Sequence, residues 1–384
     1  MKILIIGADG YLGWPTAMAL SSKGHEVVVF DNFSKRKIEL EEGVGPLWHV
    51  PTLNERIKNW KALTSYEIIL ETGDLINDRF IYNLLNQHKP DAIIHYGEQP
   101  SAPYSMKGLR QAVFTQYNNV IGNLNLLFAI KACCPDAHLI KLGTMGEYGT
   151  PNIDIEEGYL NIIHNGREDT VLFPKKPFSF YHLSKVHDSN NIYFVCKNWN
   201  LRATDLNQGY VYGVDTDETI LGDNINTSFH YDDIFGTVLN RFCVQAVAGI
   251  PLTVYGKGQQ KRACLNIKDT IKCVEIAIEN PANPGEYRVF NQFTETFSIN
   301  ELAKLVQDSC HELKIDVQVD HIENPRIEAE EHYYNPKNNK LLELGLKPNL
   351  LSSKVIKSMV KNILNNKDNI NRDIILPKIK WKAT

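Results

Sequence analysis

The sequence KILIIGADGYLG at residues 2–13 joins an apolar, β-branched run to a turn that contains three glycines. Residues 14–23 then place small and apolar side chains on one face of a predicted helix. A strand, a glycine turn and a helix in this order are typical of a dinucleotide site. Gly7 and Gly10 would let the backbone approach a pyrophosphate at the helix N-terminus, and Gly13 would let helix and strand pack closely. The spacing is GxxGxxG rather than GxGxxG, and a glycine turn without a nucleotide is the alternative interpretation.

The next signal is Asp31, which ends a second apolar strand at residues 26–30. A carboxylate at this place binds the adenosine ribose hydroxyls and would repel a 2′-phosphate, so the sequence predicts NAD rather than NADP. Lys35 and Arg36, just beyond Asp31, weaken this preference for NAD over NADP. Asp74, after the third predicted strand, either hydrogen-bonds an adenine edge or caps a helix. The predicted cofactor contacts are Gly7, Asp9, Gly10, Tyr11, Gly13, Asp31, Asn32, Lys35, Arg36, Asp74, Leu75, Asn118, Tyr181, Lys185 and Gln208.

Further strands are predicted at residues 67–70, 91–95, 138–142 and 201–206, with a long helix at 113–131. Alternating strands and helices imply a parallel sheet that is covered on both faces. The predicted fold is therefore α/β, a Rossmann-type doubly wound parallel sheet with a smaller C-terminal α/β domain for a sugar nucleotide.

The expected domain boundary follows residue 210. Residues 1–210 would form the NAD-binding domain, with insertions near 33–64 and 151–178 and with some later segments returning to it. Residues 211–384 would mainly form the substrate domain and a C-terminal tail. The second insertion is rich in Asp, Glu, Asn and Gly, and we expect it to lie over the site as a lid.

The composition excludes several classes of protein. Of the 384 residues, 43% are hydrophobic and 22% are charged, and the longest apolar runs fall short of a membrane span. The N-terminus lacks the features of a signal peptide, so we expect a cytoplasmic protein. Seven cysteines show neither a CxxC spacing nor a disulfide framework, and no metal site is predicted. A net charge of −4 without a long basic block argues against nucleic acid as a partner.

Tyr181 and Lys185 form a Tyr-x-x-x-Lys pair, which puts both side chains on one face of a predicted helix. An ammonium group and a nicotinamide cation nearby would favour the phenolate, so Tyr181 is a candidate general acid and base. Such pairs also occur on ordinary amphipathic helices, and the context has to decide. Thr144 follows the strand at 138–142 and adds a hydroxyl at the ligand edge of the sheet. Hydroxyl, tyrosine, lysine and NAD together are what hydride transfer from a sugar carbinol requires.

The glycine turn, Thr144 and the Tyr181/Lys185 pair resemble the extended short-chain dehydrogenase/reductase superfamily, which mostly works on nucleotide-sugars. Longer strings resemble the UDP-sulfoquinovose synthase family in particular. They are GYLGW at 10–14, GEQ at 97–99, SAPYSM at 101–106, LGTMGEYGTPNID at 142–154, TDLNQG at 204–209 and EAEEHYY at 328–334. The resemblance runs through nearly the whole chain.

This resemblance implies a staged reaction on UDP-glucose and sulfite. NAD would oxidise C4, water would leave across C5 and C6, sulfite would add at C6, and C4 would be reduced again. Thr144, Tyr181 and Lys185 would manage the C4 step, with Glu147 and His182 as acid/base candidates near C5 and C6. Arg262 and Arg326 would bind the diphosphate. The full set of implied substrate contacts is Gln99, Thr144, Tyr181, Asn207, Gln208, Thr237, Asn240, Arg241, Arg262, Arg326 and Glu328.

Alternatives remain for single residues and for the whole chain. His182 could be a helix-surface histidine paired with Asp188 or water, and Glu147 a loop carboxylate held by backbone amides. Sugar-nucleotide 4,6-dehydratases follow the threonine with Asp-Glu, where this chain has Met145 and Gly146. A 4,6-dehydratase, a C4-epimerase and a non-catalytic NAD-binding sensor are the alternative functions.

One departure from the family concerns sulfite. Pro100 stands where plant members have an arginine, and Lys107 or Arg110 could compensate. The sequence leaves open whether sulfite arrives free or from a partner. The resemblance also implies a homodimer that pairs through residues 113–131 and 180–198, with Leu124 as an exposed seam residue.

Overall fold

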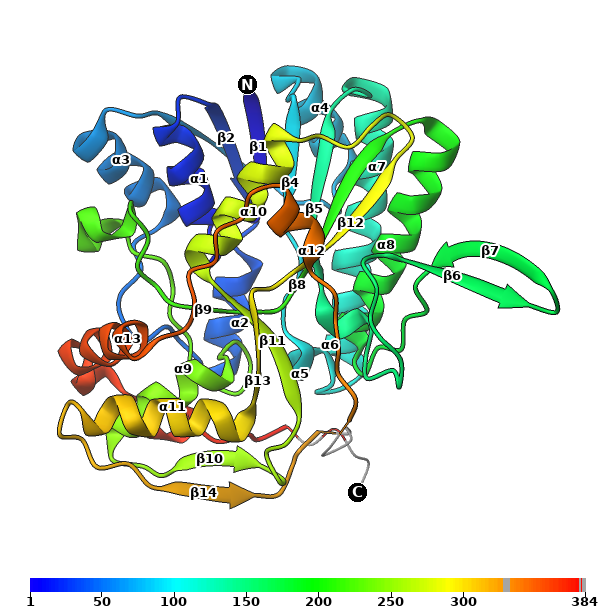
Figure 1. Cartoon of the computed structure of the whole chain (residues 1–384). Helices are drawn as coiled ribbons and strands as arrows, with labels where there is room; N and C mark the ends of the chain where they lie inside the picture. The colour runs from blue at the N-terminus through cyan, green and yellow to red at the C-terminus, as the bar shows by residue number, and fades with distance from the viewer. Residues whose placement is uncertain (327–331, 380, 382–384) are drawn as a thin grey trace.

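A seven-stranded parallel sheet organises the first layer of the computed structural model, which describes residues 1–326, 332–379 and 381 (Figure 1). The strand order is β12-β8-β5-β4-β1-β2-β3, and every neighbouring pair is parallel. The strands are β1 Lys2–Ile6, β2 Glu26–Asp31, β3 Ile68–Thr72, β4 Ala92–His95, β5 His138–Thr144, β8 Arg202–Gln208 and β12 Tyr287–Gln292. This confirms the predicted doubly wound α/β fold.

Helices cover both faces of this sheet because its strands are apolar on both sides. Ile3 and Ile5 of β1 pack in the same cluster as α1 (Gly13–Ser22) and α10 (Ile267–Glu279). The alternate residues, Leu4 and Ile6, pack on the other face with α4 (Asp78–His88), α7 (Gly122–Cys133) and α8 (Phe180–Trp199). Successive side chains of a strand point to opposite faces, so a continuous apolar run produces this two-sided burial.

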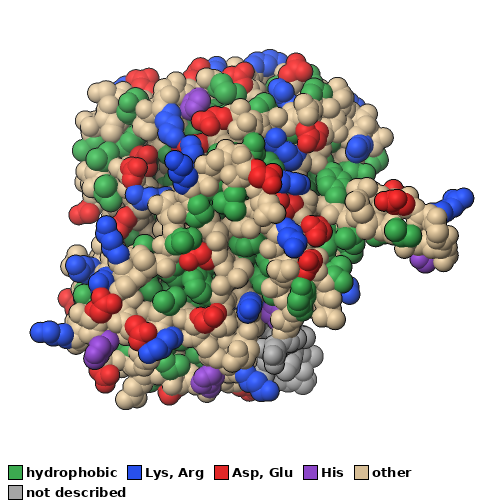
Figure 2. Space-filling model, in the orientation of Figure 1, with side chains coloured by type: hydrophobic (Ala, Val, Ile, Leu, Met, Phe, Trp, Pro, Cys, Tyr) green, Lys and Arg blue, Asp and Glu red, His purple; other side chains and the backbone are tan. Residues whose placement is uncertain are grey.

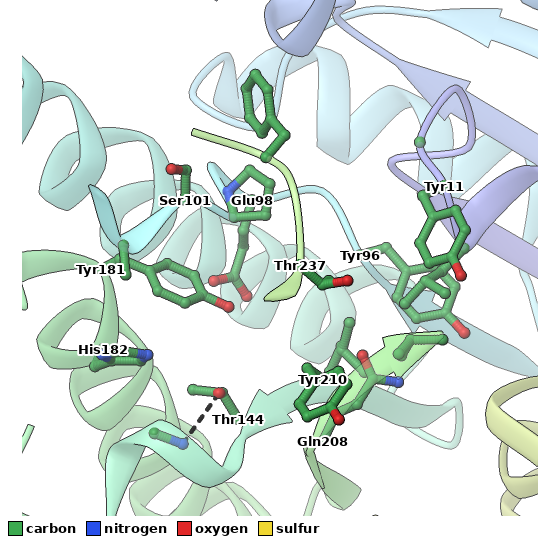
Figure 3. A pocket seen from close by; sticks show the side chains of 18 of the residues that line it. Tyr11, Tyr96, Glu98, Ser101, Thr144, Tyr181, His182, Gln208, Tyr210 and Thr237 are labelled. Carbon is green, nitrogen blue, oxygen red and sulfur yellow. Dashed lines mark hydrogen bonds between the residues drawn. The ribbon is translucent and has the colours of Figure 1, made fainter. Parts of the chain in front are cut away.

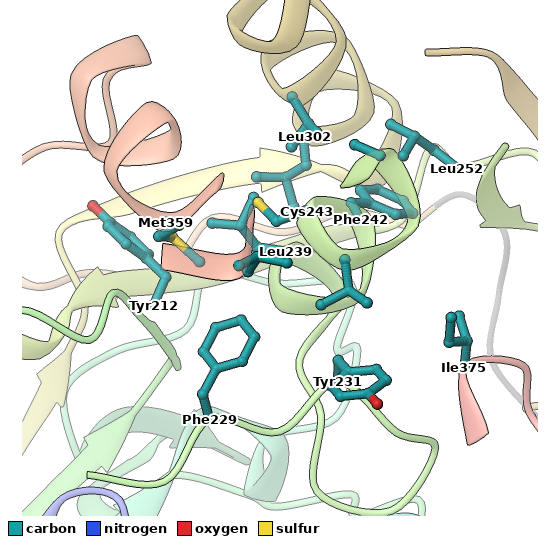
Figure 4. Close-up of a cluster of buried hydrophobic side chains, with 14 of the residues drawn as sticks. Tyr212, Phe229, Tyr231, Leu239, Phe242, Cys243, Leu252, Leu302, Met359 and Ile375 are labelled. Atoms are coloured by element: carbon teal, nitrogen blue, oxygen red, sulfur yellow. The ribbon is translucent and has the colours of Figure 1, made fainter. Parts of the chain in front are cut away.

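The second layer lies below the carboxyl ends of the parallel strands in Figure 1. Its core packs α9 (Val238–Ala248), α11 (Ile299–His311) and α13 (Ser353–Asn365) around side chains such as Leu239, Phe242, Leu302 and Met359 (Figure 4). Small sheets complete it, formed by β9 Tyr210–Tyr212, β11 Lys261–Asn266 and β13 Glu295–Ser298, and by β10 Leu252–Tyr255 with β14 Val319–Ile322. The space between the two layers becomes the site.

The first insertion, near 33–64, forms α2 (Ser34–Glu42) and α3 (Leu53–Thr64) and connects the two layers. Trp48 donates a hydrogen bond from its indole to the carbonyl of Thr227 at 2.9 Å. The predicted helix at 113–131 lies within an unbroken helical run in which a π-helical turn at Tyr117–Ile121 stands between α6 (Leu109–Gln116) and α7. The remaining short elements are α5 Ala102–Ser105, α12 Asn339–Glu343 and 3₁₀ turns at Met145–Glu147, Thr219–Leu221, Asp223–Ile225, Lys367–Asn369 and Arg372–Ile374.

The second insertion does not form the predicted lid. It carries a hairpin of β6 (Tyr159–His164) and β7 (Arg167–Leu172), whose strands pair only with each other. The hairpin projects away from the body of the molecule, with charged side chains along it (Figures 1 and 2). The expectation was wrong because a polar composition marks an exposed segment without showing where the segment lies.

Two compositional expectations can be compared with the described part of the chain. No helix there combines the length and apolarity needed to cross a bilayer. Within the same residues, no group of three or more His, Cys, Asp or Glu side chains is arranged to hold a metal ion. All seven cysteines are free thiols, and five of them are buried.

Candidate active site

A cavity of about 510 Å³ lies where the parallel strands end, between the sheet and the second layer. Its wall combines the glycine turn, the loop after β4, the segment after β5, the start of α8 and the first turn of α9. Figure 3 shows Tyr11 and Tyr96 at one end of this cavity and Tyr181, His182 and Thr144 at the other. Loops at the carboxyl ends of parallel strands are where ligands bind in this kind of fold.

The glycine turn forms a cradle that larger residues would fill. A Cβ on Gly7 would come within 2.7 Å of the Tyr96 backbone, and one on Gly13 would overlap the Gly7 carbonyl oxygen. Asp31 lines the cavity beside this turn and accepts hydrogen bonds from the Asp9 and Phe33 amides at 2.8 and 2.7 Å. Burial raises the Asp31 pKa to about 6. The close backbone approach and the carboxylate fit the pyrophosphate and ribose of NAD.

The basic residues near this turn are already paired with carboxylates. Arg36 and the buried Arg56 both bind Asp9, with shortest distances of 2.6 Å each. Arg36 does not line the main cavity, whereas Lys35 does, in an ion pair with Glu39. We predicted Asp9 and Arg36 as cofactor contacts, and in the structure their side chains bind each other.

Of the other predicted cofactor contacts, some line the cavity and one does not. Tyr11, Asn32, Leu75, Asn118 and Gln208 line the cavity. Asp74 does not line it. The Asp74 carboxylate accepts a hydrogen bond from the Asn32 side chain at 3.0 Å and one from the Ile76 amide at 3.1 Å.

Tyr181 and Lys185 occupy the first turns of α8, which begins after the N-cap Ser179. The Lys185 ammonium lies 2.6 Å from the Leu142 carbonyl oxygen and 2.8 Å from Glu98 Oε2. Burial raises the pKa of Tyr181, and the Lys185 charge opposes this rise. Tyr181 lines the cavity, whereas Lys185 is buried outside the lining and pairs with Glu98, a carboxylate that the sequence did not single out.

Thr144 ends β5 and lines the cavity, where its hydroxyl accepts a hydrogen bond from the Gly146 amide at 3.1 Å (Figure 3). Glu147, in contrast, is fully buried and does not line the cavity. Its carboxylate pairs with Lys175, lies 3.6 Å from the Lys141 ammonium and accepts from Ser189 at 3.0 Å. Burial alone would raise the Glu147 pKa, but the two ammonium groups outweigh it and hold the pKa at about 2. The predicted acid/base carboxylate thus lies behind the cavity wall.

His182 lines the cavity next to Tyr181. Its Nδ1 lies 2.9 Å from Ser179 Oγ, so the protein partner of this nitrogen is Ser179 rather than Asp188. Burial lowers the His182 pKa to about 4, which keeps the imidazole neutral at physiological pH. A Cβ at position 146 would overlap the imidazole ring, and Gly146 therefore makes room for it.

The predicted substrate residues divide into two groups. Those that line the cavity are Thr144, Tyr181, Gln208, Thr237, Asn240, Arg262 and Arg326. Gln99, Asn207 and Arg241 are buried elsewhere and hydrogen-bond to neighbours in the protein. Glu328 lies outside the described residues. Pro100 lines the cavity, but Lys107 pairs with Glu42 and Arg110 lies outside the lining, so neither cation stands in for an arginine at 100.

Sequence reasoning missed Glu98, Tyr210 and His230, which all line the cavity. Glu98 is the third residue after the end of β4, in a loop where ligands bind, and this position could have identified it as a site residue. The pairing of Glu98 with Lys185 could not be predicted, because the two residues are far apart in the chain and meet only when β4 and α8 pack in one layer.

Comparisons with known proteins agree with this geometry. Residues 3–291 match the model of the NAD dependent epimerase/dehydratase family. The chloroplastic UDP-sulfoquinovose synthase of Spinacia oleracea is 52% identical over 381 residues, which cover 99% of this chain and 79% of the relative. The UDP-sulfoquinovose synthase of Sulfolobus acidocaldarius is 42% identical over 385 residues, covering 100% and 98% of the two chains.

Solved structures support the fold at lower sequence similarity. UDP-glucose 4-epimerase from Bifidobacterium longum, in complex with NAD⁺ and UDP, superposes with a TM-score of 0.71 at 17% identity, covering 96% of this chain and 100% of that one. The level and extent of identity to the two synthases, together with the family match, lead to one conclusion. The chain belongs to the NAD-dependent epimerase/dehydratase family and, within it, to the UDP-sulfoquinovose synthases.

Proposed function

We propose that this protein converts UDP-glucose and sulfite into UDP-sulfoquinovose. The observation that carries the proposal is the adjacent placement of Tyr181 and His182 in one cavity, with Gly146 leaving room for the imidazole. Tyr181 can exchange a proton with the C4 hydroxyl, while His182 can exchange protons near C5 and C6. The overall reaction replaces the C6 hydroxyl by sulfonate, so that one water is released for each bisulfite consumed.

The cofactor is NAD, which when bound would supply the hydride acceptor for oxidation at C4 and the hydride donor for the final reduction. Gly7, Gly10 and Gly13 would hold its pyrophosphate, and Asp31 its adenosine ribose. Tyr181 removes the C4 hydroxyl proton, Thr144 hydrogen-bonds the same oxygen, and the Lys185 ammonium favours the phenolate. In the last step Tyr181 returns this proton to the C4 oxygen.

The elimination and addition steps need a group that exchanges protons near C5 and C6. His182 suits this role because it is neutral and its Nδ1 is held by Ser179, which leaves Nε2 for the substrate. A ketone at C4 acidifies the C5 hydrogen, so the base need not be strong. Glu147 would act indirectly, since it lies behind the wall and accepts a hydrogen bond from the Thr144 amide at 3.3 Å.

The UDP part would lie toward the second layer. Arg262 and Arg326 both line the cavity, and guanidinium groups suit phosphate oxygens. After burial, the charges of both arginines also contribute to lowering the His182 pKa, which supports a position for them near the sugar. We propose that they bind the diphosphate, while Thr237 and Asn240 at the start of α9 contact the remainder of the nucleotide.

The test is a mass spectrum of nucleotide-sugars after incubation of the protein with UDP-glucose, with and without sulfite. We expect a UDP-hexose sulfonate that requires sulfite and disappears in Tyr181→Phe. Tyr193→Phe, on the same helix but outside the cavity lining, is the matched control and should retain activity. UDP-galactose or a stable 4-keto-6-deoxy sugar, formed regardless of sulfite, would favour an epimerase or a dehydratase instead.

We also propose that the protein is a homodimer that pairs through α6 and α8. Large apolar side chains on these helices are exposed, namely Leu109, Val113, Phe180 and Phe194. Exposed apolar surface of this kind marks an interaction site. Leu124, expected at the seam as an exposed leucine, is instead half-buried.

A further inference from the structure

Glu98 is a buried carboxylate in the cavity for which the proposed reaction has no role. Among the described residues that line the cavity, the carboxylates are Asp9, Asp31 and Glu98. Asp9 and Asp31 lie at the glycine turn, so Glu98 is the carboxylate beside the start of α8. Its side chain is 2% exposed, and in Figure 3 its carboxylate points toward the Tyr181 hydroxyl.

We propose that Glu98 is a positioning residue that holds the Lys185 ammonium and thereby sets the pH range in which Tyr181 works. The inference rests on the proposed function in taking Tyr181 as the proton-transfer residue. The geometry is direct: Lys185 Nζ lies between Glu98 Oε2 at 2.8 Å and the Leu142 carbonyl oxygen at 2.6 Å. These two contacts fix the ammonium from two elements, the loop after β4 and the end of β5.

The charge of Glu98 acts on both members of the catalytic pair. Burial lowers the Lys185 pKa, but the Glu98 carboxylate and the Tyr181 phenolate together outweigh burial, and the net pKa is raised. For Tyr181, Glu98 adds to the rise in pKa that burial causes, against the opposing effect of Lys185. Glu98 therefore keeps Lys185 charged while it limits how far that charge favours the phenolate.

The other titratable groups around this pair do not duplicate Glu98. His95 of β4 lies 3.8 Å from the Glu98 carboxylate, and burial lowers its pKa to about 4, so it is neutral. Burial raises the pKa of Asp188 on α8 well above its usual value. Lys141 of β5 and Glu147 carry opposite charges 3.6 Å apart, behind the cavity wall. The anion in contact with Lys185 is therefore Glu98, and Glu98→Gln changes one charge at nearly constant volume.

The substitution should move both limbs of the pH profile in the same direction. Without the nearby anion the phenolate becomes easier to form, so the acidic limb moves to lower pH. Lys185 loses its counter-ion and deprotonates more readily, so the alkaline limb also moves to lower pH. A like charge at this range shifts a pKa by about one unit, so we expect roughly tenfold faster C4 oxidation on the acidic limb.

The experiment uses two readouts on the NAD-loaded protein. The first is the rate at which UDP-glucose without sulfite reduces the bound nicotinamide, measured across pH for wild type and Glu98→Gln. The second needs no sugar: an ultraviolet titration of tyrosinate, taken as the difference between each protein and its Tyr181→Phe counterpart. The expected result is a lower titration midpoint in Glu98→Gln. Glu98→Asp, which keeps the charge, should titrate like wild type, and so should the remote control Glu71→Gln.

Several outcomes would overturn the inference. An unchanged midpoint in Glu98→Gln, or an equal shift in Glu98→Asp, would show that packing rather than charge matters. If Glu98→Gln instead slowed C4 oxidation equally at every pH, with both limbs of the pH profile unchanged, packing rather than charge would again be the cause. If Glu98→Gln does not fold, Glu98→Ala carries the same expectation. If wild type does not oxidise UDP-glucose but the midpoint still shifts, the proposed function fails and the role of Glu98 stands.

Discussion

At the scale of single residues, Gly146 determines whether His182 can occupy its place. A Cβ at this position would overlap the imidazole, whose Nδ1 is held by Ser179. We predict that Gly146→Ala displaces the ring, abolishes sulfonate formation and lowers the free energy of unfolding by about 1–3 kcal/mol through overpacking. Urea denaturation and product mass spectrometry would measure both effects.

A double mutant separates the two effects of Gly146→Ala. His182→Ala removes the ring that the new methyl group would strike, so the double variant should regain most of the lost stability without regaining activity. If Gly146→Ala is as stable alone as with His182→Ala, the two groups do not compete for space.

His95 provides a test of stability against pH. It is fully buried, and burial lowers its pKa to about 4 from the ordinary value of 6.5. Between these two values the unfolded chain binds the proton and the folded protein does not, so stability is lost as pH falls from 6.5 toward 4. The loss attributable to this group is of the order of 3 kcal/mol. His95→Gln should flatten the decline in urea midpoint between pH 7 and 5, and an unchanged slope would contradict the assignment.

The residues of the site were only partly predictable from the sequence. Tyr181, Lys185 and Thr144 follow from helical spacing and from a position at a strand end, which are local signals. The burial of Glu147 and the pairing of Glu98 with Lys185 depend on how β4, β5 and α8 pack together. Local patterns cannot show which of the two carboxylates, Glu98 or Glu147, faces the cavity.

At the scale of elements, the β6–β7 hairpin is separable from the rest of the fold. Its strands pair only with each other, and most of its outer residues are exposed. Replacing residues 161–170 by Asn-Gly would join Leu160 to Val171, which already face each other, through a two-residue turn. We predict a change of less than about 0.5 kcal/mol in the free energy of unfolding, and unchanged KM and kcat. A large rise in KM would restore the idea of a lid.

Element types were predictable where apolar periodicity was strong. Six of the seven strands of the sheet were predicted within a few residues because their apolar runs are continuous, whereas the edge strand β12 was not predicted. The π-helical turn at Tyr117–Ile121 was not, since its composition suits an ordinary helix. Its position is explained by Asn119, which accepts from the Gln99 amide at 2.8 Å and donates to Ser184 Oγ at 2.9 Å. These tertiary contacts are invisible in a helical pattern.

At the scale of the whole molecule, the proposed dimer can be tested by one charge on α8. Phe194 is 57% exposed, and Phe194→Asp would place a carboxylate in an apolar interface. We expect this variant to have the mass of a monomer by light scattering, because burying an unpaired charge is costly. Leu364→Asp on α13, an exposed apolar residue elsewhere, is the matched control and should leave the mass unchanged. A wild-type monomer, or a Phe194→Asp dimer, would rule out this face.

The order of the strands in the large sheet bears on how the chain is made. Its last strand, β12, comes from residues 287–292 and pairs with β8 near the middle of the sequence. Between them the chain has already passed through α9, β10 and β11 in the second layer. During synthesis the nascent chain therefore leaves the ribosome with the β8 edge of its first sheet unpaired for many residues. We expect this intermediate to be the species on which chaperones act.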